Sequence, residues 1–180
     1  MSAIAGRVWK FGDDINTDLM LPGSLTYASE DAQKRAVFSA NRPGWVDLVA
    51  AGDVIVGGRN YGIGSSRPAA RSLRNLGLGC LLAESINGLF FRNAVNYGFL
   101  ALECPGVSDL FEEGDIAELS LADWRVRNRR TGGHVAVAPV PEGLLTIVRG
   151  GGVYPLLELQ GLVSAHTLGE KGKRAATVRE

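Results

Sequence analysis

The sequence predicts a single α/β domain, and two patterns support this class. First, apolar strand-like runs alternate with helix-like segments between Val54 and Leu102. Such alternation is typical of parallel βαβ units with right-handed crossovers. Second, short β-rich runs separated by turns follow Asp109, which indicates an antiparallel addition rather than a second domain. A chain of 180 residues is long enough for one domain with a substantial core.

The composition argues against several classes of function. Nineteen Lys and Arg balance nineteen Asp and Glu, so we expect no nucleic-acid partner. No run of eighteen apolar residues predicts a membrane span, and the N-terminus lacks the pattern of a secretory signal. Cys80 and Cys104 lie in apolar runs and are expected to be buried free thiols of a cytoplasmic protein. No cysteine or histidine spacing suits a metal or iron–sulfur site on this chain.

Local signals define the expected elements. Val8 and Trp9 give the first strand, residues 4–11, its β character, and an acidic loop follows over residues 12–23. A helix is expected to begin at Ser29, with Ala36 to Phe38 on its buried side. Further strands are expected at 54–56, 80–83, 99–102, 115–121, 124–128 and 134–138, and helices at 68–77, 89–97, 141–149 and 153–160. We expect one domain over residues 1–161 and a disordered tail over 162–180.

The candidate site is the stretch 53–70, which reads DVIVGGRNYGIGSSRPAA. A buried strand passes through four glycines into Ser65, Ser66 and Arg67, and then into a helix. Glycine lets a backbone approach a ligand closely, and the first N–H groups of a helix favour a bound anion. Arg67 can hold a carboxylate bidentately, and a serine among exposed N–H groups is a candidate for an activated alkoxide. The stretch therefore predicts an anion site.

Known motifs and ordinary helix capping account for this stretch only in part. A serine before a helix is also the ordinary N-cap, and proline is common in the first helical turn. Ile63 stands where a P-loop needs lysine, and Arg67 stands where a dinucleotide fingerprint needs its third glycine. The nucleophile elbow GxSxG is absent as well. A nucleotide site stays open as an alternative, because Glu84 ends the next apolar run near where a ribose-binding acid would lie.

The text GGRNYGIGSSRPAA resembles the active-site serine loop of the aconitase superfamily's swivelling domain. The resemblance is strongest to the separate small subunits of 3-isopropylmalate dehydratase and related hydro-lyases. The matching positions are Asn60, Tyr61, Gly62, Gly64, Ser65, Ser66 and Arg67. A second element, Thr17-Asp18 followed by an apolar pair and proline, is similar to a family segment that lines the same cleft. The chain departs from the family at Pro68-Ala69, which replaces Glu-His.

This resemblance implies a swivelling β/β/α domain over nearly the whole chain. It implies the role of a small subunit in a heteromeric hydro-lyase that removes and re-adds water on a hydroxy acid. The reaction expected first is the isomerisation of 2- and 3-isopropylmalate in leucine biosynthesis. A large subunit is expected to carry a [4Fe-4S] cluster, and this chain itself is expected to bind no cofactor or metal.

The resemblance also assigns roles to residues. Ser65 is the expected catalytic base, and the expected substrate-binding residues are Arg67, Ser66, Asp18, Thr17, Asn60, Gly62 and Gly64. In the family a loop at the position of residues 23–27 helps to select the substrate and is a specificity loop. This loop contains no arginine here, so the resemblance implies a substrate with an uncharged substituent. Methylated malate and homocitrate-like acids remain alternatives. So do a phosphate- or nucleotide-binding module and, given Pro68-Ala69, a catalytically inactive assembly subunit.

Overall fold

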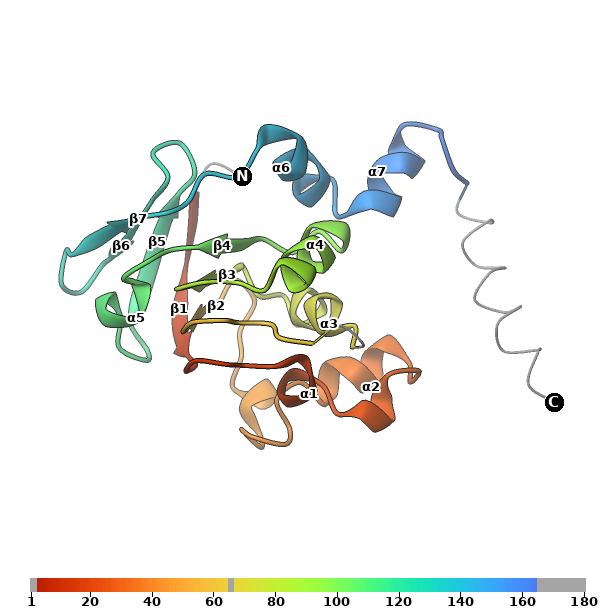
Figure 1. The fold of residues 1–180 in the computed structure, drawn as a ribbon, viewed down its shortest axis with the longest axis horizontal. Helices are drawn as coiled ribbons and strands as arrows, with labels where there is room; N and C mark the ends of the chain where they lie inside the picture. The colour runs from red at the N-terminus through yellow and green to blue at the C-terminus, as the bar shows by residue number, and fades with distance from the viewer. Residues whose placement is uncertain (1–2, 65–66, 165–180) are drawn as a thin grey trace.

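One mixed sheet organises the chain. The computed structural model describes residues 3–64 and 67–164, and Figure 1 shows their arrangement. Within these residues, seven strands form a sheet in the order β4-β3-β2-β1-β5-β6-β7. The strands are β1 (Ala3–Lys10), β2 (Val54–Gly57), β3 (Cys80–Ala83), β4 (Ala101–Glu103), β5 (Ile116–Ser120), β6 (Arg125–Asn128) and β7 (His134–Ala136). The helices are α1 (Thr17–Met20), α2 (Glu30–Arg35), α3 (Ala69–Asn75), α4 (Gly88–Asn96), α5 (Val107–Leu110), α6 (Glu142–Arg149) and α7 (Val153–Leu159).

The parallel half of the sheet confirms the α/β prediction. β1 pairs in parallel with β2, β2 with β3, and β3 with β4. α3 joins β2 to β3 and α4 joins β3 to β4, so these strands are parallel units with helical crossovers. All residues of β2 and β3 are buried, which explains their continuous apolar sequences.

The antiparallel half was predicted as antiparallel strands, and it is continuous with the same sheet. β5 pairs with β1, β6 with β5, and β7 with β6, all antiparallel. The burial of β5 and β6 alternates along the strand, so one face of this half meets the core and the other meets solvent. The predicted turn between residues 129 and 133 joins β6 to β7.

Two hydrophobic cores lie on opposite faces of the sheet because successive strand side chains point to opposite sides. Along β2, Ile55 belongs to one core, whereas Val54 and Val56 belong to the other. The first core is filled by the buried sides of α3 and α4 and by an aromatic group around Trp45. The second core contains residues of β5, β6 and α6, and both free cysteines are buried there, as expected.

Three segments differ from the sequence predictions. The loop expected over 12–23 contains α1, because the Asn16 side chain accepts the Leu19 N–H and caps a helical turn. α2 ends at Arg35, before the residues that were expected to form its buried side. Phe38 is fully buried but has φ +55°, so it enters the core from a turn rather than from a helix. The short helix α5 was not predicted.

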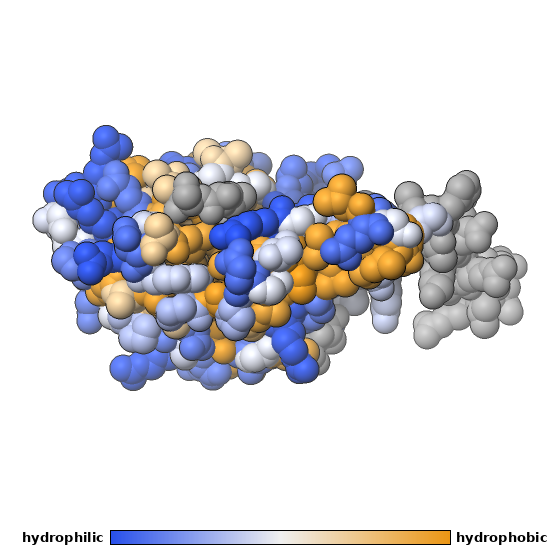
Figure 2. All heavy atoms as spheres, turned by 90° about the horizontal axis from the view of Figure 1, so that it is seen from above, coloured by the Kyte–Doolittle hydropathy of each residue, from blue (hydrophilic) through white to orange (hydrophobic). Residues whose placement is uncertain are grey.

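The C-terminal helices lie along one side of the molecule. Figure 2 views this side from above and shows apolar surface toward the end that carries α7. Tyr154, Leu159 and Leu162 are exposed there. Most of the expected tail, residues 165–180, lies outside the described residues. Within the part of the chain that the structure describes, no helix is long and apolar enough to cross a membrane.

A buried carboxylate fixes the antiparallel hairpin to the sheet. Asp115 accepts hydrogen bonds from Asn128 Nδ2 at 2.7 Å and from Arg130 Nε at 2.5 Å. Asn128 is fully buried and also donates to the Leu110 carbonyl. The Arg130 guanidinium, with the Asn128 amide and a backbone N–H, holds the pKa of Asp115 well below its usual range.

This network predicts a stability that depends on pH. Because the pKa of Asp115 is lower in the folded state, ionised Asp115 stabilises the fold above its ordinary pKa of about 4. That contribution is lost as the pH falls further toward the folded-state pKa. We expect Asp115→Asn to lower Tm at pH 7 and to make the loss of Tm below pH 4 shallower. Thermal melts between pH 2 and 8 test this, with exposed Asp109→Asn as the control; equal pH profiles for Asp115→Asn and wild type would contradict it.

Candidate active site

Two loops at the carboxyl ends of β1 and β2 run side by side and form the candidate site. We restrict the name acidic loop to residues 12–17, out of the 12–23 expected from the sequence, and call residues 58–64 the glycine loop. Backbone hydrogen bonds connect them repeatedly: Gly58 N to Gly12 O, Asp14 N to Arg59 O, Gly62 N to Ile15 O, and Thr17 N to Ile63 O. Because parallel strands present their carboxyl ends at one edge, this is where an α/β sheet usually binds ligands. The sequence predicted both loops but not this ladder between them.

Gly62 allows the glycine loop to pass close to the protein core. Its φ is +85°, and a Cβ at this position would lie 2.3 Å from the Phe90 ring. Its N–H donates to the Ile15 carbonyl at 2.7 Å. Gly64 has φ +99°, and a Cβ there would lie 2.6 Å from Thr17 Oγ1. Both glycines were predicted to shape the site, and both are at positions where a side chain would displace a neighbour.

We therefore expect Gly62→Ala to destabilise the protein by about 3 kcal/mol, from a left-handed backbone combined with overpacking against Phe90. Urea unfolding measures this difference in the free energy of unfolding. Gly143→Ala in α6 is the matched control, because a Cβ there meets nothing within 4 Å and its φ is not positive. A change of less than about 1 kcal/mol at Gly62 would be the ordinary effect of a point substitution and would contradict this account.

Arg67 and the Thr17-Asp18 pair come together at the end of the glycine loop. Arg67 Nε lies 2.9 Å from Asp18 Oδ1, and the side chain of Arg67 is 22% exposed whereas that of Asp18 is 66% exposed. Thr17 is buried beside Gly64 at the start of α1. The structure thus brings together four of the predicted site residues: Thr17, Asp18, Gly64 and Arg67.

Two predicted residues, Ser65 and Ser66, lie outside the described residues. Their neighbours in the chain, Gly64 and Arg67, border the Thr17-Asp18 pair. Pro68 precedes α3 as its N-cap residue and makes no side-chain cap. The roles assigned to the two serines therefore stay predictions.

Asn60 contacts the acidic loop. Its side-chain Nδ2 donates to Asp14 Oδ1 at 2.9 Å, and its backbone N–H donates to Ser85 Oγ at 2.8 Å. Asn60 therefore connects the glycine loop to the loops that follow β1 and β3. Its predicted role in binding substrate stays a prediction.

Gln33 and Arg71 hold the segment that follows Gly23, and no pattern in the sequence indicated this. The amide Nε2 of Gln33 lies 2.9–3.2 Å from the carbonyls of three residues, Leu25, Thr26 and Ala28. Its Oε1 accepts from Arg71 Nη2 at 2.9 Å, and Gln33 itself is buried.

Gly23 lies against the Arg67 guanidinium, since a Cβ there would be 2.6 Å from Nη2. The predicted specificity loop, Gly23–Tyr27, therefore adjoins Arg67, with Tyr27 almost fully exposed.

Glu84 is already engaged within the fold. Its two carboxylate oxygens accept the N–H groups of Gly106 and Ser108, each at 2.8 Å. Burial raises the pKa of Glu84, but these hydrogen bonds outweigh it, and the pKa is lowered overall. Glu84 thus caps α5, which removes the reason to expect that it binds a ribose. Among the residues that the structure describes, no group of three His, Cys, Asp or Glu is arranged to hold a metal ion.

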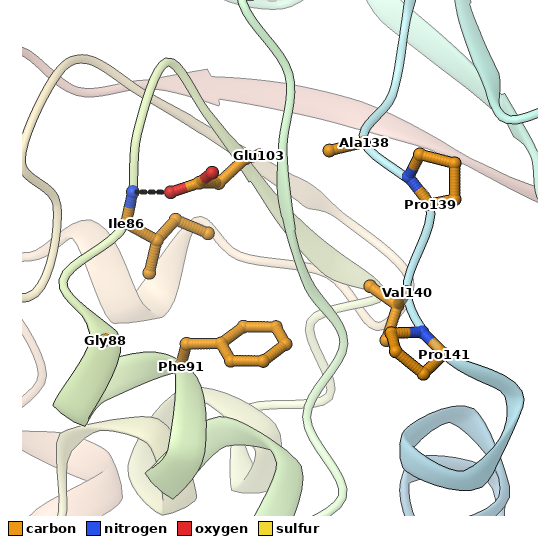
Figure 3. Close-up of a pocket in the computed structure, with 8 residues that line it drawn as sticks. All are labelled: Ile86, Gly88, Phe91, Glu103, Ala138, Pro139, Val140 and Pro141. Carbon is orange, nitrogen blue, oxygen red and sulfur yellow. Dashed lines mark hydrogen bonds between the residues drawn. The ribbon is translucent and has the colours of Figure 1, made fainter.

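A separate pocket of about 250 Å³ lies at the carboxyl end of β4 (Figure 3). Its lining is mainly apolar, with the Phe91 ring on one side and Val140 and Pro141 on the other. Glu103 is its acidic residue and accepts the Ile86 N–H at 2.8 Å. None of the predicted site residues lines this pocket.

Comparisons with known proteins show the family and the fold of this chain. Residues 21–106 match the family described as "Aconitase C-terminal domain". The isopropylmalate/citramalate isomerase small subunit of Methanocaldococcus jannaschii is 39% identical over 159 residues, which cover 87% of this chain and 95% of that protein. This chain belongs to the 3-isopropylmalate dehydratase small-subunit family. Small subunit 1 of 3-isopropylmalate dehydratase from Methanopyrus kandleri is also 39% identical, over 88% of this chain and 94% of its own.

The family's fold is shared as well. The crystal structure of 3-isopropylmalate dehydratase from M. jannaschii matches with a TM-score of 0.82 and 29% identity, over 89% of this chain and 96% of that one. The predicted resemblance and the α/β swivelling-domain fold are thereby confirmed. Because these matches extend along nearly the whole length of the relatives, the shared fold includes both halves of the sheet.

Proposed function

We propose that this chain is the small subunit of a heteromeric hydro-lyase that isomerises 2- and 3-isopropylmalate in leucine biosynthesis. The observation that carries the proposal is the meeting of Arg67 with Thr17-Asp18 at the end of the glycine loop. These residues come from two distant parts of the chain, and both carry the family's motifs. Membership of the small-subunit family supports the proposal that this chain assembles with a large subunit. A biosynthetic role of this kind is consistent with a complex in the cytoplasm.

The chemistry needs two contributions. A [4Fe-4S] cluster on the large subunit would supply an electrophile for the substrate hydroxyl and one carboxylate. This chain would bind the other carboxylate through Arg67, whose planar guanidinium suits bidentate contact. Ser65 would remove a proton from the carbon next to the hydroxyl-bearing carbon, and that C–H electron pair would form the C=C bond as the hydroxyl leaves. Loop N–H groups and Arg67 would favour the serine alkoxide.

Asp18 has a defined place in this proposal. In the structure it forms an ion pair with Arg67, so the guanidinium already has a carboxylate partner. Asp18 is largely exposed, and an ion pair of this kind is weak in water, so a substrate carboxylate could share or replace it. The pair would hold the Arg67 side chain in one orientation before substrate arrives.

The loop beside Arg67 indicates which substituent the substrate carries. Gly23–Tyr27 contains no cationic residue, so the substituent that it meets is expected to be uncharged, as an isopropyl or methyl group is. One relative is named for both isopropylmalate and citramalate, and citramalate carries a methyl group instead. Isopropylmalate is therefore proposed first, and a methylated malate second.

The experiment is an anaerobic pull-down of this chain from its native cells. Iron content and the ultraviolet absorbance of the alkene formed from 3-isopropylmalate are then measured. An iron-bearing partner together with alkene formation supports the full proposal. If an iron-bearing partner is present but no alkene forms from 3-isopropylmalate, citramalate and other hydroxy acids are tested as substrates.

Two results would overturn the assignment. A complex that contains iron but turns over no hydroxy acid would favour the inactive assembly subunit. Absence of any iron-bearing partner, combined with saturable ATP or NAD binding by the chain, would favour the nucleotide-binding alternative.

A further inference from the structure

Two residues with left-handed backbone conformation face each other within the two loops of the candidate site. Among the described residues, those other than glycine with positive φ are Asp14, Phe38, Asn60 and Trp124. Two of these four, Asp14 (φ 55°) and Asn60 (φ 58°), are direct hydrogen-bond partners. Asn and Asp tolerate this conformation better than other side chains, but it still opposes folding. Such residues persist only where the surrounding structure holds them in place.

The contacts of the pair link three loops. Asn60 Nδ2 donates to Asp14 Oδ1 at 2.9 Å, while the Asp14 N–H donates to the Arg59 carbonyl at 2.8 Å. The Asn60 N–H donates to Ser85 Oγ, which belongs to the loop after β3. Both members of the pair are exposed to solvent. An exposed hydrogen bond adds little to stability, so stability alone does not account for two strained residues at this place.

The pair lies in the ladder of backbone hydrogen bonds, between the connection of Gly58 with Gly12 and the connections that lead to Thr17. Two positions further along the glycine loop, the Gly62 N–H donates to Ile15, and the next connection joins Ile63 to Thr17. Any sideways shift at Asn60 would therefore pass to Thr17, Gly64 and Arg67, because backbone hydrogen bonds tolerate little displacement.

We propose that Asp14 and Asn60 form a positioning pair that sets how the glycine loop enters the active site. This inference rests on the proposed function for its kinetic consequences. Asn60 then acts through the loop backbone rather than by touching substrate. The pair needs one amide as donor and one carboxylate as acceptor, and this need can be tested by exchanging the two side chains.

The decisive variants are Asn60→Asp and the exchange Asp14→Asn/Asn60→Asp. The single variant places two carboxylates together, whereas the exchange restores one amide and one carboxylate. Aspartate and asparagine both tolerate positive φ, so these variants change the side-chain charge and leave the backbone conformation as it is. In the complex with the large subunit, we expect Asn60→Asp to lower kcat about 100-fold, a typical cost of misplacing catalytic groups by about 1 Å. The exchange should recover most of this loss.

A matched control exists elsewhere on the surface. Asn75 Nδ2 donates to Glu30 Oε2 at 2.8 Å, which is another exposed amide–carboxylate pair. Asn75→Asp also places two carboxylates together, at the far end of α3 where Arg71 pairs with Glu30, and should leave kcat unchanged. A third variant, Asn60→Gly, keeps the left-handed backbone without the side chain and should also lose activity.

Amide hydrogen exchange of residues 12–17 and 58–64 supplies a second readout that does not depend on turnover. Exchange should be faster in Asn60→Asp and return to the wild-type rate in the exchange variant. If wild-type complex shows no turnover, the proposed function fails while this exchange measurement still tests the pair. The pair is rejected if Asn60→Gly retains wild-type kcat, or if the exchange variant recovers neither kcat nor the slow hydrogen exchange.

Discussion

Ser65→Ala is expected to abolish turnover of the reconstituted complex while the two subunits still assemble. Removing a general base typically lowers kcat by 10²- to 10⁴-fold, and we expect about 10³-fold here. KM should change little, since Arg67 rather than Ser65 is proposed to bind the substrate carboxylate. Initial rates of alkene formation give kcat, and size-exclusion chromatography checks assembly.

Two control variants make the Ser65 result specific. Ser39→Ala, at an exposed position outside the candidate site, should leave both kcat and assembly unchanged. Ser66→Ala is expected to lower kcat less than Ser65→Ala does, because Ser66 is expected to help bind the substrate rather than to remove its proton. Near-normal kcat in Ser65→Ala would remove Ser65 from the mechanism, and a larger loss at Ser66 would exchange the two roles.

Arg67→Lys is expected to raise KM by about 100-fold although the charge is preserved. Lysine presents a point charge, whereas the guanidinium offers a planar pair of N–H donors to one carboxylate. Lysine would also lose the present geometry, in which Nε lies 2.9 Å from Asp18 and the guanidinium fits against Gly23. Steady-state kinetics over a wide range of 3-isopropylmalate concentrations measure the change.

The control for Arg67 is Arg92→Lys, because Arg92 is an exposed arginine on α4 outside the candidate site. It should show wild-type KM and kcat. Asp18→Asn offers an independent check, since it removes the charge that orients Arg67 but leaves the guanidinium in place. It should raise KM less than Arg67→Lys does; an equal or larger rise would make Asp18 itself a direct substrate ligand.

Much of the fold could be predicted because its signals are local. Continuous apolar runs at β2 and β3 identify buried parallel strands, since both faces of such strands are covered. The glycine-rich stretch identified the candidate loop, because only glycine suits the positive φ and close approach found at Gly62 and Gly64. Thr17 and Asp18 were linked to that loop by resemblance alone, over a separation of about fifty residues.

Other features could not be predicted because they depend on partners distant in sequence. Gln33 is buried and donates to three carbonyls of another segment, and no local sequence pattern indicates this. Phe38 was expected on a helix, but a turn with positive φ directs it into the aromatic core. From the sequence, Glu84 was at the position of a ribose-binding acid. In the structure its carboxylate instead accepts hydrogen bonds from the Gly106 and Ser108 N–H groups at the start of α5.

The sequence by itself determined the class of fold, the glycine loop and the family, since each depends on residue types at short spacing. Tertiary structure alone decided how the acidic loop lies along the glycine loop, which brings Arg67 to Asp18 and Asn60 to Asp14. The physical reason is that parallel pairing of β1 with β2 carries both chain segments past the same edge of the sheet. Backbone hydrogen bonds there join residues more than forty positions apart, and no local pattern encodes such a pairing.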